Sequence, residues 1–306
     1  MTMRDEIRST VEELRGTYFD GKGAVERELL DRGAPLVPEL LEIAAEEGTL
    51  PYTFKRWFEK IGGAADELLR VRREGPGRLR RYALEALASI GAAHRLDRRD
   101  RAAVERLVRL RLKYAADDGD DLARWPRYWP GFWMTVRGDG LKAITAELGL
   151  HHLTRATVPM GVHAAVMEEH SITVTGPAGE RQYAERIFIS PPVEGWRILF
   201  LGHESLGHLT DWAKRLSRVC GEAHAYYNDE YDSDDSSWYI ARDGARHRGP
   251  FAFEDEEDEK ADPDTVATYM SVTPDALMLA DDLSDGWLAT THPEVTPWHF
   301  KGALPI

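Results

Sequence analysis

The chain has 306 residues, of which 42% are hydrophobic and 30% are charged, and its formal net charge is −14 at pH 7. The sequence has no apolar run near the roughly 18 residues that a membrane helix needs, and its N-terminus, MTMRDEIRSTVEEL, lacks the apolar centre of a signal peptide. Its single cysteine, Cys220, excludes an intramolecular disulfide and a multi-cysteine zinc site. We therefore expect a cytoplasmic globular protein with room for two domains.

Charge is divided unevenly along the chain. Residues 1–114 carry 23 Lys+Arg and 20 Asp+Glu, a balance of +3. Subtracting these from the totals of 39 and 53 leaves 16 and 33 for residues 115–306, a balance of −17. The two halves therefore differ in the sign of the partner that their surfaces favour.

Apolar residues in the first half recur at helical spacing and predict short helices. Two such stripes are Leu36, Leu40, Leu41 and Ala44, and Phe54, Trp57, Phe58 and Ile61. The segment GRLRRYALEALASIGA, residues 77–92, resembles a HEAT-type helix, and APLVPELLEIAAEE is similar to the other member of such a pair. The resemblance covers residues 20–113 and implies an α-solenoid, whose curved surface holds a partner. We expect this HEAT-like helical domain to span residues 1–118.

The helical half also contains an arginine-rich run. Residues 70–113 hold fourteen Lys+Arg against five Asp+Glu. Such a run is typical of solenoids that bind nucleic acid, and on this hypothesis Arg78, Arg81, Arg98 and Arg101 contact phosphates. A solvated helix face is the alternative that we favour, because aromatic residues for base stacking are nearly absent from the run.

The second half, residues 119–306, alternates strand-like and helix-like segments. A strand FWMTVRG, a helix DGLKAITAELGL and a hairpin SITVTG-PAGE-RQYAERIFIS are followed by a strand WRILFLG, a helix LTDWAKRLSRVCG and three more strands. This order predicts an α+β domain in which helices cover one face of a mainly antiparallel sheet. The pattern is consistent with two βαββ-type units, near residues 131–190 and 195–253, followed by a C-terminal tail, 254–306.

Three motifs in this half carry a second resemblance. IFISPPVEGWRILFLG, LSRVCGEAHAYYNDEYDSDDSSWYIARDGARHR and DPDTVATYMSVTPDAL together resemble an uncharacterised actinobacterial protein family. The resemblance covers residues 130–280. No activity is attached to that family, so the resemblance implies a fold and assigns no functional residue.

The segment GHESLGH, residues 202–208, is close to two catalytic motifs. His203 and His208 are five residues apart, which separates them by about 140° on a helix, so they do not fit the zinc-protease motif. Ser205 in a strand–turn–helix context is typical of a hydrolase nucleophile, but His203 stands where that turn needs a small residue. A turn between a strand and a helix is the interpretation that we favour, and a serine hydrolase centred on Ser205 stays as an alternative. The other histidines have no recognisable ligand spacing, and we expect neither a metal nor a cofactor.

Two acidic segments complete the list of candidate sites. The first is Asp229, Glu230, Asp232, Asp234 and Asp235, and the second extends from Glu254 to Glu259 together with Asp262 and Asp264. The first lacks the glycine and the terminal glutamate of a calcium loop. Our first hypothesis is a non-enzymatic protein-binding module that uses this acidic surface against a basic protein partner. An immunity or antitoxin protein is one class of this kind, and nucleic-acid binding through the arginine-rich helices is the alternative.

Overall fold

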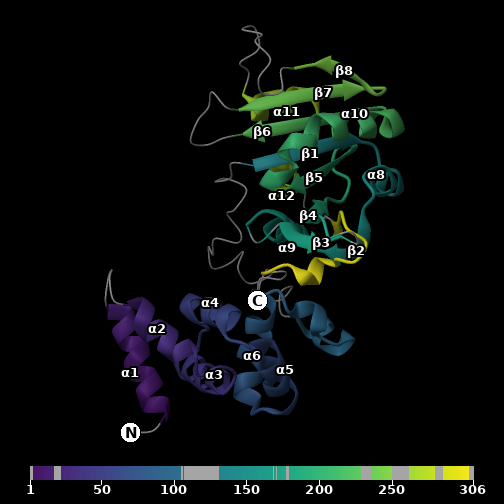
Figure 1. Ribbon diagram of the computed structural model, residues 1–306. Coiled ribbons are helices and arrows are strands. Elements are labelled where there is room, and N and C mark those ends of the chain that lie inside the picture. Colours follow the sequence, from purple (N-terminus) through teal and green to yellow (C-terminus); the bar gives the residue numbers. More distant parts are fainter. Residues whose placement is uncertain are drawn as a thin grey trace. The chain divides into compact units, whose positions relative to one another are not determined.

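The computed structural model describes residues 3–16, 22–104, 106, 131–167, 169, 171–176, 179–228, 236–249, 262–279 and 285–302. They form two compact units, one that ends at Val104 and one that follows it in the sequence (Figure 1). The boundary that we expected between residues 118 and 119 lies outside the described residues. Among the described residues, no helix has both the length and the apolar character that crossing a bilayer requires.

The N-terminal unit is helical, as the apolar spacing predicts. Its elements are α1 (Met3–Gly16), α2 (Lys22–Leu30), α3 (Leu36–Glu47), α4 (Tyr52–Lys60), α5 (Ala64–Glu74), α6 (Gly77–Ser89) and a 3-10 turn η1 (Ala93–Arg95). Both expected stripes are buried, the first on α3 and the second on α4 and the residue that follows it. Gly48 has a φ of 75° and ends α3, because a left-handed residue after a helix favours glycine.

Ion pairs on the outside of α3 join helices that are distant in the sequence. Arg4 of α1 lies 3.3 Å from a carboxylate oxygen of Glu39, 3.3 Å from one of Glu42 and 3.4 Å from one of Glu46. Arg78 of α6 contacts the same Glu42 at 2.7 Å. Such exposed pairs contribute little each, at most about 1 kcal/mol. Their main effect is to neutralise positive charge within the unit.

The C-terminal unit is an α+β structure built on nine strands. Its elements are β1 (Gly131–Arg137), α8 (Leu141–Glu147), β2 (His151–Ala156), α9 (Val158–Val162), η4 (His163–Met167), β3 (Ser171–Thr175), β4 (Arg181–Ile189), β5 (Trp196–Leu201), η5 (His203–His208), α10 (Leu209–Cys220), β6 (Glu222–Asn228), β7 (Ser237–Arg242), β8 (Ala245–Arg248), α11 (Pro263–Met270), α12 (Pro274–Leu279), β9 (Gly286–Thr290) and η7 (Pro297–His299). The strand order is β2-β9-β4-β5-β1-β6-β7-β8, and β3 pairs with β4. Every pairing between these strands is antiparallel, which confirms the predicted antiparallel α+β region.

Residues 254–306, which the sequence pattern suggested to be a tail, contain part of the sheet. Strand β9 lies between β2 and β4, where Leu288 pairs with Thr154 on one side and with Phe188 on the other. Helices α11 and α12 belong to the same stretch of chain. The sheet is therefore complete only when the end of the chain folds back onto strands much earlier in the sequence, where His151 pairs with Thr290 and Ile189 with Trp287.

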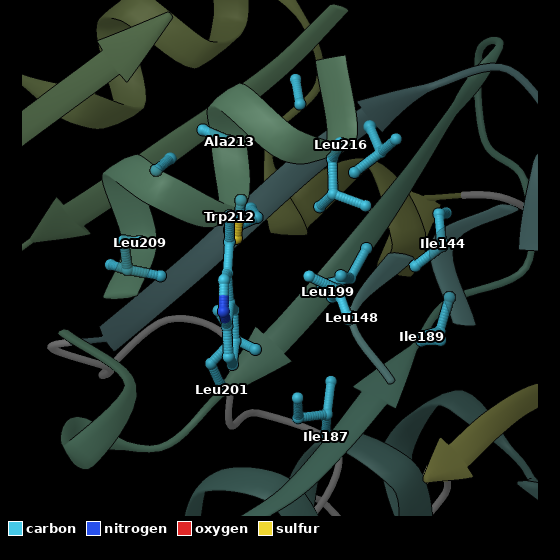
Figure 2. Packing of buried hydrophobic residues seen from close by; sticks show 14 of the residues in the cluster. Ile144, Leu148, Ile187, Ile189, Leu199, Leu201, Leu209, Trp212, Ala213 and Leu216 are labelled. Atoms are coloured by element: carbon cyan, nitrogen blue, oxygen red, sulfur yellow. The ribbon is translucent and has the colours of Figure 1, made fainter. Parts of the chain in front are cut away.

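One face of the sheet packs against α8 and α10 (Figure 2). Trp212, Ala213 and Leu216 of α10 lie over Leu199 of β5 and the apolar residues of neighbouring strands. Ile144 of α8 belongs to the same cluster. The run WRILFL of β5 is buried throughout, without the alternation of a half-exposed strand. This is the pattern of a strand that is covered on both faces.

The other face is also covered, although we expected helices on one face only. Gly161 of α9 lies so close to Phe188 of β4 that a Cβ there would overlap the ring, so only glycine allows this approach. Ser271, at the end of α11, reaches Tyr226 of β6. Phe188 and Tyr226 have large side chains that need cover, and α9 and α11 provide it.

Replacing Leu199 with alanine should lower the free energy of unfolding of the C-terminal unit by about 3 kcal/mol, because a fully buried side chain leaves a cavity in the cluster. Leu153→Ala is the matched control, since Leu153 is 37% exposed, and it should cost less than about 1 kcal/mol. Urea denaturation followed by tryptophan fluorescence suits the measurement, because eight of the nine tryptophans follow residue 104. Equal losses in the two variants would show that Leu199 is not a core residue.

Candidate functional site

Strand β6 carries three buried polar residues, the last of which contacts Ser271 at the end of α11. Glu222, His224 and Tyr226 occupy alternate positions and therefore share one face of the strand. They are 4%, 0% and 0% exposed, respectively. Because buried polar groups are stable only with partners, their contacts define the chemistry of this face.

Two arginines from the flanking strands hold the buried carboxylate of Glu222. Arg242 of β7 donates from Nε to Glu222 Oε1 at 2.7 Å, and Arg137 of β1 donates to Oε2 at 2.8 Å. His224 Nε2 lies 3.1 Å from Oε1. Burial raises the pKa of Glu222, but the hydrogen bonds from Arg242, His224 and Arg137 outweigh it and hold the pKa below its usual value. Glu222 is therefore ionised at neutral pH.

The remaining hydrogen bonds follow from the charge on Glu222. An ionised carboxylate accepts only, so the ring proton of His224 lies on Nε2 and its Nδ1 is an acceptor. Tyr226 then donates to Nδ1 across 2.8 Å, and its oxygen accepts the hydroxyl of Ser271 across 2.9 Å. Hydrogen bonds thus run in one direction from Ser271 at the end of α11 to Glu222.

The pKa values favour a structural role for this series, which we call the β6 network. Burial lowers the pKa of His224 to about 4, although the hydrogen bond to Glu222 acts in the opposite direction. Burial also raises the pKa of Tyr226. A general base works best with a pKa near the working pH, so His224 is a weak base at pH 7. The network therefore attaches α11 to the sheet rather than activating Ser271.

Sequence reasoning missed the β6 network, although one signal for it was present. In EAHAYYN, residues 222–228, polar and aromatic side chains alternate with alanine, which places Glu222, His224 and Tyr226 on the same face of a strand. The partners Arg137, Arg242 and Ser271 come from three other elements. Only the pairing of the strands reveals them.

Ser205 lies in η5, between β5 and α10, so the predicted turn between a strand and a helix is confirmed. Its side chain is fully buried, and its hydroxyl donates to the carboxylate of Glu185. A buried serine bonded to a carboxylate is poorly placed to meet a substrate. Cys220 ends α10, and burial raises the pKa of its half-buried thiol. The hydrolase hypothesis stays a prediction without a described contact in its favour.

The four arginines of the nucleic-acid hypothesis have different surroundings. Arg78 makes a two-pronged contact with Glu42, and Arg101 donates to the carbonyl oxygens of His94 and Leu96. Arg81 and Arg98 are exposed. Two of the four side chains thus make contacts within the unit. Fewer arginines are therefore available to bind a phosphate backbone than the sequence alone indicates.

Residues 229–235 lie outside the described residues, but the positions on both sides of them are described. Asn228 ends β6, and Ser236 precedes β7 and donates to the side-chain oxygen of Asn228 at 3.4 Å. The Nδ2 group of Asn228 donates to Asp264 of α11 at 2.8 Å. The ends of the first acidic segment are therefore joined to the helix that follows the second one.

Three more carboxylates lie near Asn228, and these belong to Asp262, Asp264 and Asp275. The carboxylate of Asp262 accepts the backbone N–H of Thr265 and caps α11. Partial burial raises the pKa of Asp264, and the carboxylates of Asp262 and Asp275 raise it further against the hydrogen bond from Asn228. Crowded carboxylates of this kind favour a cation or a basic side chain nearby.

No protein-family model, curated protein or solved structure matches this chain. The resemblances to HEAT-type helices and to an actinobacterial family therefore stay predictions. Within the described residues, His, Cys, Asp and Glu side chains form no group of three that could hold a metal ion.

Acid should destabilise the C-terminal unit through His224. The unfolded imidazole takes up a proton at its ordinary pKa of 6.5, whereas the folded one stays neutral until about pH 4. The free energy of unfolding contributed by neutral His224 is therefore fully present above pH 6.5 and is lost as the pH falls toward 4, by about 3 kcal/mol. Urea midpoints at several pH values should show this slope, reduced in His224→Gln and kept in the control His208→Gln. An equal slope in His224→Gln contradicts the assignment.

Proposed function

We propose that the chain is a protein-binding module that contacts a basic partner through a negatively charged surface at the Asn228 end of β6. The observation that carries the proposal is the hydrogen bond between Asn228 and Asp264, because it joins the attachment points of both acidic segments. Residues 229–235 follow Asn228 in the sequence, and residues 254–259 precede Asp262, which caps α11. The described residues that flank the two acidic segments therefore lie at the Asn228 end of β6. Concentrated charge of one sign gives fast, salt-sensitive association with an oppositely charged protein.

The outer face of α11 offers a second contribution to this surface. Tyr269 is 83% exposed on the same helix that carries Asp264. Exposed tyrosines are enriched where proteins bind one another, since the ring buries a large area at low entropic cost. An exposed aromatic side chain on a helix that also carries a carboxylate suits a partner whose arginines and lysines have long apolar stems.

We also propose two finer features. The N-terminal helices form a HEAT-like stack, which is supported by the packing of α3, α5 and α6 around the buried stripes. The C-terminal unit combines two βαββ-type units, near residues 131–190 and 195–253, with the added strand β9, and the first strands of the two units, β1 and β5, pair with each other. An immunity or antitoxin protein is the class that we favour, because neutralising a basic enzyme requires a complementary surface and no catalytic group.

Neutralising the first acidic segment should abolish partner capture. The variant replaces five residues together: Asp229→Asn, Glu230→Gln, Asp232→Asn, Asp234→Asn and Asp235→Asn. Its control makes the same change in net charge at described exposed positions: Glu28→Gln, Asp31→Asn, Glu74→Gln, Glu194→Gln and Asp243→Asn. We expect a basic protein to be recovered from a lysate of the source cells by the wild type and by the control. Recovery should fall at least about tenfold with the first variant and at roughly 0.5 M salt.

Two results would contradict the proposal. One is a partner that the five-residue variant retains as well as the wild type does. The other is recovery of nucleic acid that depends on Arg78, Arg81, Arg98 and Arg101, which would favour the alternative function. Treating the lysate with nuclease separates these outcomes, because it removes nucleic acid and leaves a direct protein contact intact.

A further inference from the structure

The edge strands of the sheet differ in how they are protected. Strands β2 and β8 end the strand order, and β3 pairs with β4 alone among the described strands. An edge strand exposes backbone N–H and C=O groups that can pair with another chain. Natural proteins commonly block such pairing with bulges, charged side chains or prolines.

Both terminal edges carry such protection. Strand β2 has an irregular register between His151 and Thr154, and His152 within it has a φ of 54°. Strand β8 has a register shift against β7 and exposes Arg246 and Arg248. Bulges twist an edge and arginines add repulsion, so neither strand offers a regular edge to a second sheet.

Strand β3 has none of these devices. Its sequence, SITVT, contains no charged residue, glycine or proline, and its register with β4 is uninterrupted from Ser171 to Thr175. Thr173 and Thr175 are exposed, whereas Ile172 and Val174 are half-buried against a small cluster that includes Phe300. The backbone pairing described for β3 is the one with β4. Its outer edge is thus regular, uncharged and rich in β-branched residues, which favour strands.

We propose that β3 pairs antiparallel with β3 of a second copy of the chain, with a two-fold axis at Thr173. The pattern of β3 reads the same from both ends: polar, apolar, polar, apolar, polar. In this register Thr173 faces its own copy, Ile172 faces Val174, and Ser171 faces Thr175. Threonine pairs and pairs of β-branched residues both stabilise neighbouring strands. The contact is isologous, so it closes at two copies.

Pairing would also bury the apolar side chains of β3. Ile172 and Val174 lean on Ala184, Val295 and Phe300 and remain partly exposed. In the paired form, Ile172 of one copy covers Val174 of the other, so the two clusters become continuous across the axis. Burying this apolar area adds to the hydrogen bonds of the new strand pair.

The negative charge of the chain opposes the pairing only weakly. The described residues next to the acidic segments are Asn228 of β6 and Asp262, which caps α11, and β6 is three strands from β4 in the sheet order. Strand spacing places β6 about 14 Å from β4. Repulsion between exposed charges is largely screened beyond about 8 Å at physiological ionic strength. This inference is independent of the acidic surface proposed above, since it uses a different edge of the unit.

Charge at position 173 tests the register directly. Sedimentation velocity of the wild type, up to roughly 1 mM, should show a monomer–dimer equilibrium. Thr173→Lys and Thr173→Glu should each be monomeric, because two like charges then meet at the axis. An equimolar mixture of the two variants should regain a dimer, since lysine then faces glutamate. The control Thr175→Lys should still dimerise, because its lysine faces Ser171.

Wild type that sediments as a monomer at every concentration would overturn the proposal. So would a dimer that survives in Thr173→Lys, or a mixture of the two variants that stays monomeric. Thr173 is exposed, so each variant should keep the urea midpoint of the wild type. Regained dimer in the mixture also shows that both variants are folded. Capture of a basic partner, tested with the acidic-segment variant, can succeed or fail without changing these results.

Discussion

Burial of both faces of the sheet is the constraint on which the C-terminal unit depends. Helices α8 and α10 cover one face with apolar side chains, so that face needs no polar partner. The other face holds Glu222, His224 and Tyr226, which are buried. A buried carboxylate costs several kcal/mol unless it is paired. Two arginines and a histidine pair with Glu222, and Tyr226 connects His224 to Ser271 at the end of α11.

Because the β6 network joins several elements, a substitution at one of its residues also affects parts of the C-terminal unit that are distant in the sequence. Arg137, Glu222 and Arg242 belong to three adjacent strands, and Ser271 directly follows α11. Removing the arginines leaves a buried charge unpaired, whereas removing Ser271 leaves Tyr226 to find another donor. The position of α11, and with it that of Asp264 and Tyr269, is therefore set by groups in the interior of the unit. The proposed binding surface therefore depends on the position of α11 against the sheet.

The sequence predicted those elements whose pattern is local and long. The stripes of α3 and α4, the apolar run of β5 and the amphipathic α10 follow from spacing alone. Strand β9 was missed because it has five residues and its partners, β2 and β4, lie far earlier in the sequence. The β6 network was missed because strand pairing is not visible in sequence. The composition gives the number of arginines in residues 70–113 but not their partners. In the structure, Arg78 contacts Glu42, and Arg101 donates to two backbone carbonyl oxygens.

The two proposed surfaces obey different physics, and this difference separates their roles. Contact through the acidic segments gains its energy from opposite charges, so added salt weakens it. Pairing through β3 gains its energy from backbone hydrogen bonds and the cover of Ile172 and Val174, while like net charge opposes it. That repulsion is already largely screened at physiological ionic strength, so added salt leaves the pairing almost unchanged. A single increase in ionic strength then weakens the partner contact and spares the pairing, which is the behaviour expected if one surface recognises a partner and the other joins two copies.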